Sequence, residues 1–256
     1  MKSYFTNYKT SKLLTVALSF VLFSVMLNAS TKDNQKSYQT VMMCTFPQEI
    51  LKEQTLKAMA ITYMNQQEDE KDAPKHLHKA LESLKKDKLS KKLHKKSVNL
   101  AKSWAGIKKK IDKGINKKNV SKIYKDVYIL NKSCLDIANQ LANKKKSLVK
   151  GQIATLNVYI HQLTAIYLIK SWDAVSTKEY KSYVEEIISN YEKLSTALSK
   201  NKKVSADIKL NLKKINKAFM TFKFMTTSDS GRYMPMLADK KASDIDMLTK
   251  TILKGK

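Results

Sequence analysis

The chain has 256 residues, 49 Lys and Arg against 22 Asp and Glu, and a formal net charge of +27. Hydrophobic residues make up 43% of it, whereas Gly and Pro number only 5 and 3. This length suits one or two domains with a sizeable core, and the apolar fraction excludes a disordered basic tail. Because Gly and Pro are scarce, a turn-rich all-β fold is also disfavoured, and we expect an all-α protein.

The positive charge comes almost wholly from lysine, since Arg232 is the only arginine. Arginine supplies the forked donor set that reads guanine and phosphate, whereas lysine neutralises phosphate only as a point charge. This weakens a nucleic-acid interpretation of the charge without excluding non-specific binding to phosphate; together with the export signal described next, it leads us to expect no nucleic-acid partner. The lysines are expected on solvated helix faces.

Residues 1–29 have the pattern of a secretory signal. Lys2, Lys9 and Lys12 precede an uncharged apolar run over 13–27, and Leu27-Asn28-Ala29 resembles a cleavage site. The run falls short of the ~20 residues that cross a bilayer comfortably, although an uncleaved membrane anchor is the alternative. An exported, periplasmic protein without an output module of its own is expected.

Helical periodicity continues from about residue 32 to the end. The first helix is expected over about 32–67 with a kink or break at Pro47, where Thr45 and Gln48 can cap a restart. A short helix follows over about 76–85, and then an apolar stripe from Leu100 to Ile111. Heptad spacing over 120–141 resumes over 149–167, which predicts one long helix over about 120–172.

The remaining helices have clear start signals. Ser176 and Glu179 form a capping box, and Ser205 can cap the next helix. A last helix is expected over 239–254. The predicted architecture is all-α: two antiparallel helical bundles in tandem, end to end, that share the long central helix. The expected divisions are a signal at 1–29, a first bundle at 30–146 and a second at 147–256.

The sequence contains no recognisable catalytic or cofactor motif. A haem-attachment CxxCH, the Glu-x-x-His pair of di-iron bundles, HExxH, a P-loop and a Rossmann glycine pattern are all missing. His76 and His78 lie about 200° apart on a helix and cannot share a metal ion. We expect no catalytic residues, metal site or cofactor, and hence a protein that is not an enzyme.

Cys44 and Cys134 are the only cysteines. Two cysteines in an oxidising compartment commonly pair, and this bond would stabilise the chain by about 4 kcal/mol in the entropic description. The alternative is a pair of unbonded thiols that pack as small hydrophobes.

Residues 85–110 contain four clusters of lysine: Lys85-Lys86, Lys91-Lys92, Lys95-Lys96 and Lys108-Lys109-Lys110. They either contact anionic lipid head groups or envelope polymers, or form ordinary solvated helix surface.

The segment 152–172, with Asn157-Val158-Tyr159-Ile160-His161-Gln162, resembles the first helix of the N-terminal domain of type IV pilus methyl-accepting chemotaxis transducers (PilJ-type). Residues 45–55 can be laid on the same pattern, 109 positions upstream, with Gln48 against Asn157. Residues 218–222 and 233–245 resemble stand-alone exported forms with two such domains. The resemblance implies a sensory helical bundle.

The resemblance also implies where a ligand would bind. Gln48, Leu51 and Gln162 keep the family residue type, and Lys52 and His161 occupy its serine position. The arginines of the family pattern fall on other residue types here. Gln48, Lys52, His161 and Gln162 are thus the candidate ligand-binding residues; the alternative places Lys52 and His161 on the exposed sides of their helices.

The sequence favours a non-catalytic exported sensor-type or ligand-binding module. Its expected partners are a second copy of itself or a membrane receptor, and its expected ligand a small anion. The alternative is a structural or adaptor protein whose lysine-rich helix faces bind anionic envelope surfaces.

Overall fold

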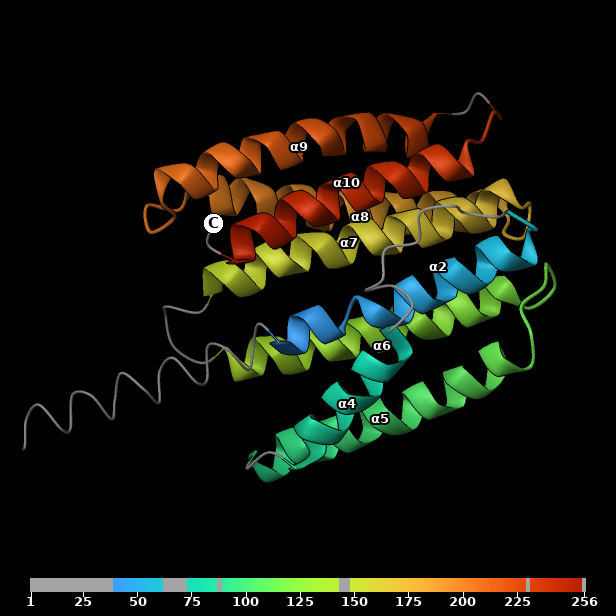
Figure 1. Cartoon of the computed structure of the whole chain (residues 1–256), viewed down its shortest axis with the longest axis horizontal. Helices are drawn as coiled ribbons and strands as arrows, with labels where there is room; N and C mark the ends of the chain where they lie inside the picture. Colours follow the sequence, from blue (N-terminus) through green and yellow to red (C-terminus); the bar gives the residue numbers. More distant parts are fainter. Residues whose placement is uncertain (1–38, 62–72, 87–88, 143–147, 229–230, 255–256) are drawn as a thin grey trace, which may run out of the picture.

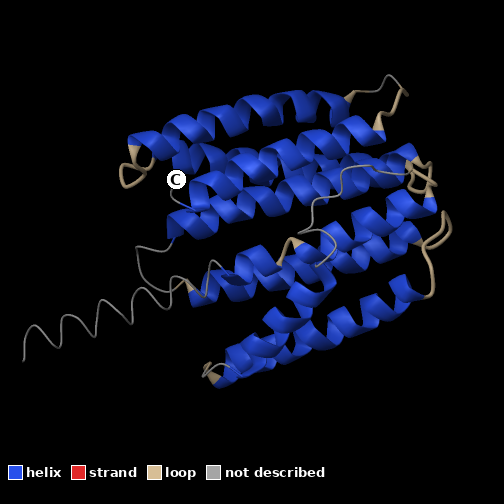
Figure 2. Ribbon diagram, in the orientation of Figure 1, coloured by secondary structure: helices blue, strands red, loops and turns tan. Residues whose placement is uncertain are grey.

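The computed structural model describes residues 39–61, 73–86, 89–142, 148–228 and 231–254. Within these ranges the chain forms helices joined by loops and turns, with no strand (Figure 2). The predicted all-α helical-bundle class is confirmed. The predicted signal at 1–29 and the expected division at 146/147 lie outside the described residues.

The helices form two sets that lie side by side (Figure 1). The first set consists of α2 (Phe46–Ala58), α4 (Ala73–Lys86), α5 (Lys91–Asp112) and α6 (Val120–Leu141), and the second of α7 (Leu148–Ser171), α8 (Thr177–Lys200), α9 (Ala206–Thr227) and α10 (Pro235–Lys254). The sets meet where α7 packs against α2 and α6. They are therefore lateral neighbours, and the predicted end-to-end arrangement is wrong.

The single long helix predicted over 120–172 is wrong as well. The structure has α6 and α7 as separate helices, and the Tyr124 hydroxyl donates to the Gln162 carbonyl oxygen at 3.3 Å. In one continuous helix, 38 residues would separate these groups by about 57 Å. The heptad pattern was real, but α6 and α7 lie against each other instead of end to end.

α7 is the central helix of the molecule. It packs against α2, α6, α8 and α10, and residues 160–169 are all buried. A helix enclosed in this way needs apolar residues on every side, which explains why its sequence has no polar face. Asn157, His161, Gln162 and Thr164 are therefore polar side chains held deep inside the protein.

Several local predictions are confirmed. The Ser176 and Ser205 side chains accept from the backbone amides of Glu179 and Ile208, at 3.2 and 3.4 Å, and so start α8 and α9. The chain breaks before Pro47, between a helical turn at 39–43 and α2. The predicted Thr45 cap is wrong, because its hydroxyl makes no capping hydrogen bond and donates to the Met42 carbonyl oxygen at 2.7 Å. However, α2 ends at Ala58, well before the predicted end of the first helix at about 67.

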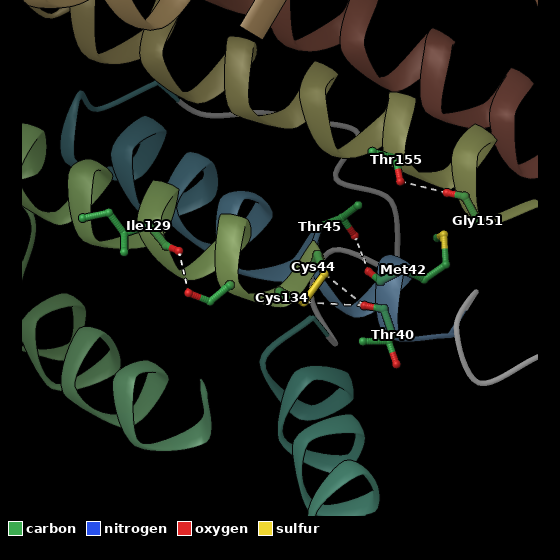
Figure 3. The surroundings of a disulfide bond; sticks show 9 residues. Thr40, Met42, Cys44, Thr45, Ile129, Cys134, Gly151 and Thr155 are labelled. Carbon is green, nitrogen blue, oxygen red and sulfur yellow. Dashed lines mark hydrogen bonds between the residues drawn. A yellow bond between two sulfur atoms is a disulfide. The ribbon is translucent and has the colours of Figure 1, made fainter. Parts of the chain in front are cut away.

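A disulfide joins Cys44, just before α2, to Cys134 of α6, with a Cα–Cα distance of 5.8 Å (Figure 3). The two sulfur atoms lie 3.1 and 3.6 Å from the Thr40 carbonyl oxygen. Both cysteines are buried. Of the two alternatives that the sequence left open, the structure contains the bond, which fixes the start of α2 to α6.

No helix among the described residues combines the length and the apolar character that crossing a membrane requires.

Candidate functional site

A cluster of buried polar side chains lies where the two sets of helices meet. We call it the polar centre; its members are Glu49 and Lys52 of α2, Asn157 and His161 of α7, and Asp239 and Asp246 of α10. Each of the six is at most 8% exposed. Acidic and basic side chains are seldom buried so completely unless they are paired, so the contacts within the cluster decide what it can do.

Lys52 and Asp239 form the first contact of the polar centre. The Lys52 Nζ lies 2.8 Å from the Asp239 Oδ1, and the two side chains are only 3% and 4% exposed. The pair links α2 of the first set to α10 of the second. Because the carboxylate already neutralises the ammonium, the charge of Lys52 is satisfied inside the protein and is not directed at a ligand.

His161 lies between two carboxyl groups. Its Nε2 is 3.4 Å from the Glu49 Oε1 and 3.9 Å from the Asp246 Oδ1. Asp246 also accepts a hydrogen bond from the Asn157 amide and pairs with Lys250 at 2.8 Å. One imidazole thus joins a carboxyl group of α2 to a carboxyl group of α10.

The two carboxyl groups beside His161 have opposite pKa shifts. Burial raises the pKa of Glu49, and the nearby charge of Asp246 raises it further, against the charges of His161 and the two lysines. Burial would also raise the pKa of Asp246, but its hydrogen bonds and charge contacts with His161 and Lys250 outweigh burial and hold that pKa well below its usual range. Asp246 is therefore the ionised member, and Glu49 holds its proton more readily.

The carboxyl groups of the polar centre outnumber the ammonium groups that face them. Three carboxyl groups, from Glu49, Asp239 and Asp246, face the two ammonium groups of Lys52 and Lys250. If all five were ionised and the imidazole neutral, the net charge would be 2 − 3 = −1. A proton on Glu49 removes this excess, in agreement with the raised pKa of that carboxyl group.

Some buried polar atoms of this region have no hydrogen-bond partner among the described residues. They include both side-chain amide atoms of Gln48, the Asn157 Oδ1 and the His161 Nδ1. Gln48 precedes Lys52 by one turn of α2 and so lies on the same face. Such groups cost about 1–3 kcal/mol each when they stay unsatisfied, so they favour a polar partner, which can be a buried water, a small polar molecule or an ion.

The structure brings most of the predicted ligand-binding residues together. Lys52 and His161 belong to the polar centre, and Gln48 lies beside it. The alternative that placed Lys52 and His161 on exposed helix sides is wrong. Gln162 is also buried, but the hydrogen bond that it makes is through its backbone: its carbonyl oxygen accepts from the Tyr124 hydroxyl of α6.

Sequence reasoning missed Glu49, Asn157, Asp239 and Asp246. The signal available for them was a polar residue at an apolar position of a helical stripe: Asp239 and Asp246 are spaced by seven and lie on one face of α10. Among the described residues, no group of three or more His, Cys, Asp or Glu has the arrangement of a metal site.

Comparison with known proteins finds no family model, curated protein or solved structure that matches this chain. The resemblance to the PilJ-type domain stays a prediction from the residues that carry it.

Proposed function

We propose that this chain is a non-catalytic, exported sensor-type module, and that the polar centre is the part of it that responds to a ligand. The observation that carries the proposal is the burial of an incompletely satisfied charged cluster at the junction of the two helix sets. Well-packed apolar side chains are often at least as stabilising as a buried ion pair, so stability alone does not require charges at this junction. The cluster therefore has a role beyond packing.

The polar centre is placed to convert ligand binding into a change between the two helix sets. Lys52 and Glu49 come from the first set, and Asp239, Asp246 and His161 from the second. A bound polar molecule, or a change in proton occupancy, alters contacts that cross the junction. The module would pass this change on through a partner, either a second copy or a membrane receptor, as the resemblance to chemotaxis transducers implies.

The charges of the polar centre limit the chemical class of ligand that it can bind. The sequence led us to expect a small anion, but the pairing of Lys52 with Asp239 leaves carboxyl groups in excess. A small molecule that donates hydrogen bonds or carries a positive charge suits this excess better than an anion does.

A thermal-shift screen of the purified full chain tests this proposal. The panel holds small anions, small cations and neutral metabolites at one ionic strength. We expect at least one cationic or neutral donor compound to raise the melting temperature, and His161→Gln to abolish that shift. His94→Gln changes an exposed histidine of α5 and is the matched control.

The variant Glu49→Gln guards against a His161 variant that fails to fold, because it keeps the shape of the side chain and the other contacts. A screen without any stabilising compound would contradict the proposal. So would compounds that stabilise the wild type and both polar-centre variants equally.

The second candidate function is that of an adaptor on anionic envelope surfaces. α5 carries eight lysines and one acidic residue, Asp112, and most of these lysines are exposed. The dependence of binding on ionic strength distinguishes the two functions. Binding to anionic vesicles through exposed lysines should weaken steeply between low and physiological ionic strength, whereas the shift from a ligand in the buried centre should change little.

A further inference from the structure

The exposed apolar side chains of the molecule are concentrated on one helical hairpin, α9 and α10. Nine large hydrophobic side chains of the described residues are exposed, and seven of them belong to this hairpin. The seven are Leu210, Met220, Phe224, Met234, Met236, Leu237 and Met247. The other two, Val98 and Ile129, lie on α5 and α6. Single exposed apolar residues are normal, whereas a concentration on one pair of helices marks an interaction surface.

On α9 the exposed apolar side chains alternate with lysines along one side of the helix. This outer stripe consists of Leu210, Lys213, Lys217, Met220 and Phe224, at successive intervals of three, four, three and four residues, and all five are exposed. Phe224 is 74% exposed and Met220 58%. α9 packs against α8 and α10 at the edge of the second helix set (Figure 1). The outer stripe is therefore the convex side of an outermost helix.

The start of α10 lies near the end of α9. The Met234 amide donates to the Tyr167 hydroxyl near the end of α7, at 3.0 Å. The Thr226 carbonyl oxygen accepts from the Tyr180 hydroxyl at the start of α8, at 2.6 Å. Because only a short loop separates α7 from α8, both bonds lie at the same end of the second set. The exposed methionines at the start of α10 are therefore close to the apolar end of the outer stripe.

The outer side of the hairpin carries positive charge and little negative charge. Two of the three acidic residues of α10 are buried in the polar centre, and the third, Asp244, lies 3.6 Å from the Lys241 Nζ. α9 contains one acidic residue, Asp207, in its first turn. By contrast, Lys213 and Lys217 are exposed and form no ion pair with any described residue. The outer side of the hairpin thus combines apolar and cationic side chains.

This combination suits the surface of an anionic lipid bilayer. Apolar side chains of a helix that lies flat on a bilayer enter the boundary between head groups and acyl chains. The long lysine side chains lie along the apolar surface and bring their ammonium groups to the lipid phosphates. A fluid bilayer accepts a convex helix surface, and unbranched methionine adapts to such surroundings. The mixture of Phe, Met and Lys in one stripe follows this chemistry.

A second copy of this chain is a less suitable occupant. Two molecules of net charge +27 repel each other. A symmetric contact through the outer stripe would also bring Lys213 and Lys217 of both copies together, and like charges at an interface oppose association. Anionic lipids neutralise these lysines instead.

We propose that the α9–α10 hairpin binds the surface of an anionic lipid bilayer, with Phe224, Met220 and Met236 in the interfacial region and Lys213 and Lys217 at the lipid phosphates. The inference does not depend on the polar centre. It also differs from the adaptor function considered above, in which the exposed lysines of α5 make the contact. Here apolar side chains enter the bilayer and contribute binding that salt does not screen.

A site-specific fluorescent label on the full chain tests this proposal. Phe224→Cys introduces the only free thiol among the described residues, since Cys44 and Cys134 are bonded to each other, and a nitrobenzoxadiazole label is attached to it. Vesicles of phosphatidylglycerol and phosphatidylcholine in equal amounts should shift its emission to shorter wavelength, and vesicles of phosphatidylcholine alone should not. Ser103→Cys places the control label on an exposed position of α5, in the other helix set, and should show no shift.

Two double variants, compared with the wild type by vesicle co-sedimentation, measure the apolar contribution. Met220→Gln with Phe224→Gln changes only exposed side chains to a good helix former, so the melting temperature should be kept. Its partition coefficient into the anionic vesicles should fall about tenfold or more. Val98→Gln with Ile129→Gln removes the two exposed apolar side chains outside the hairpin and should bind as the wild type does.

Three outcomes would overturn the proposal: no emission shift from the label at position 224, an equal shift from the label at position 103, or unchanged partitioning of the variant of Met220 and Phe224. Binding that disappears at high salt and is equal for the two double variants would assign the contact to the lysines of α5. Self-association without vesicles, measured by light scattering and abolished in the variant of Met220 and Phe224, would assign the hairpin to a second copy instead.

Discussion

At the scale of the residue, the pair Lys52 and Asp239 offers the most direct test of the polar centre. Both side chains are almost fully buried, so Lys52→Met leaves the Asp239 carboxylate without its partner. Removing one member of such a pair typically costs about 3–5 kcal/mol, and we expect a loss of this size in the free energy of unfolding. Urea denaturation at neutral pH measures it.

The double variant Lys52→Met, Asp239→Leu is the control for this prediction. It removes both charges and should recover most of the lost stability, because a well-packed apolar pair is often as stable as a buried ion pair. If the single and double variants were equally destabilised, the two residues would not interact as described.

The raised pKa of Glu49 predicts a pH dependence of stability. Its folded pKa lies above the unfolded value of about 4.3, so its contribution is fully present below that value and is lost as the pH rises through the folded pKa. Glu49→Gln cannot release this proton and should show a flatter stability profile over that window. Urea midpoints measured from about pH 4 to 8 test this.

The pH effect of Glu49 can be separated from that of Asp246 and from that of an exposed glutamate. Asp246 has a depressed pKa, so its contribution is present above about pH 3.9 and is lost only as the pH falls further. The exposed Glu185 supplies the control variant Glu185→Gln. Identical profiles for the wild type and Glu49→Gln would count against a raised pKa of Glu49 in the polar centre.

At the scale of the element, helix starts were visible in the sequence, whereas the partner of each helix was not. Ser176 and Ser205 satisfy free amides of their own first turns, which is a local matter. The heptads of 120–141 and 149–167 show only that each helix buries a face. They do not show whether α6 and α7 continue one another or fold back side by side.

The cap of α8 gives a prediction at this scale. Ser176→Ala removes the acceptor for the Glu179 amide and should lower the free energy of unfolding by about 1 kcal/mol. Ser182→Ala makes the same chemical change at an exposed position within α8 and should be neutral or slightly stabilising, since alanine favours the helix interior. Equal losses in the two variants would show that the cap contributes nothing.

At the scale of the whole molecule, the disulfide is the one covalent bond between distant parts of the chain. Cys44 and Cys134 are 90 residues apart, and α2, α4, α5 and most of α6 lie within the loop they close. Closing a loop of this size restricts the unfolded chain and adds about 4–5 kcal/mol in the entropic description. We expect reductant to lower the urea midpoint of the wild type accordingly.

The double variant Cys44→Ala, Cys134→Ala separates the bond from the chemistry of the reductant. It should start from the lower stability and show no further response to reductant. If reductant left the wild-type midpoint unchanged while free thiols could be titrated, the bond would not stabilise the fold.

The polar centre also belongs to the whole molecule, because its residues come from α2, α7 and α10. The family resemblance predicted Lys52 and His161 as site residues. For Asp239 and Asp246, the only indication in the sequence was a polar residue within an apolar stripe of a helix. Their role follows from the packing of α10 against α7 and α2, which brings residues 85 to 187 positions apart in the chain into contact.

The sequence by itself determined the all-α class, the start of α8 and α9, and the break before Pro47, because capping and helical periodicity act within a few residues. It left two alternatives open for the cysteines, and it joined α6 and α7 into one helix. Only the tertiary structure decided these points and assembled the polar centre. The physical reason is that periodicity reports how much of a helix is buried, whereas the neighbour that buries it depends on the path of the whole chain.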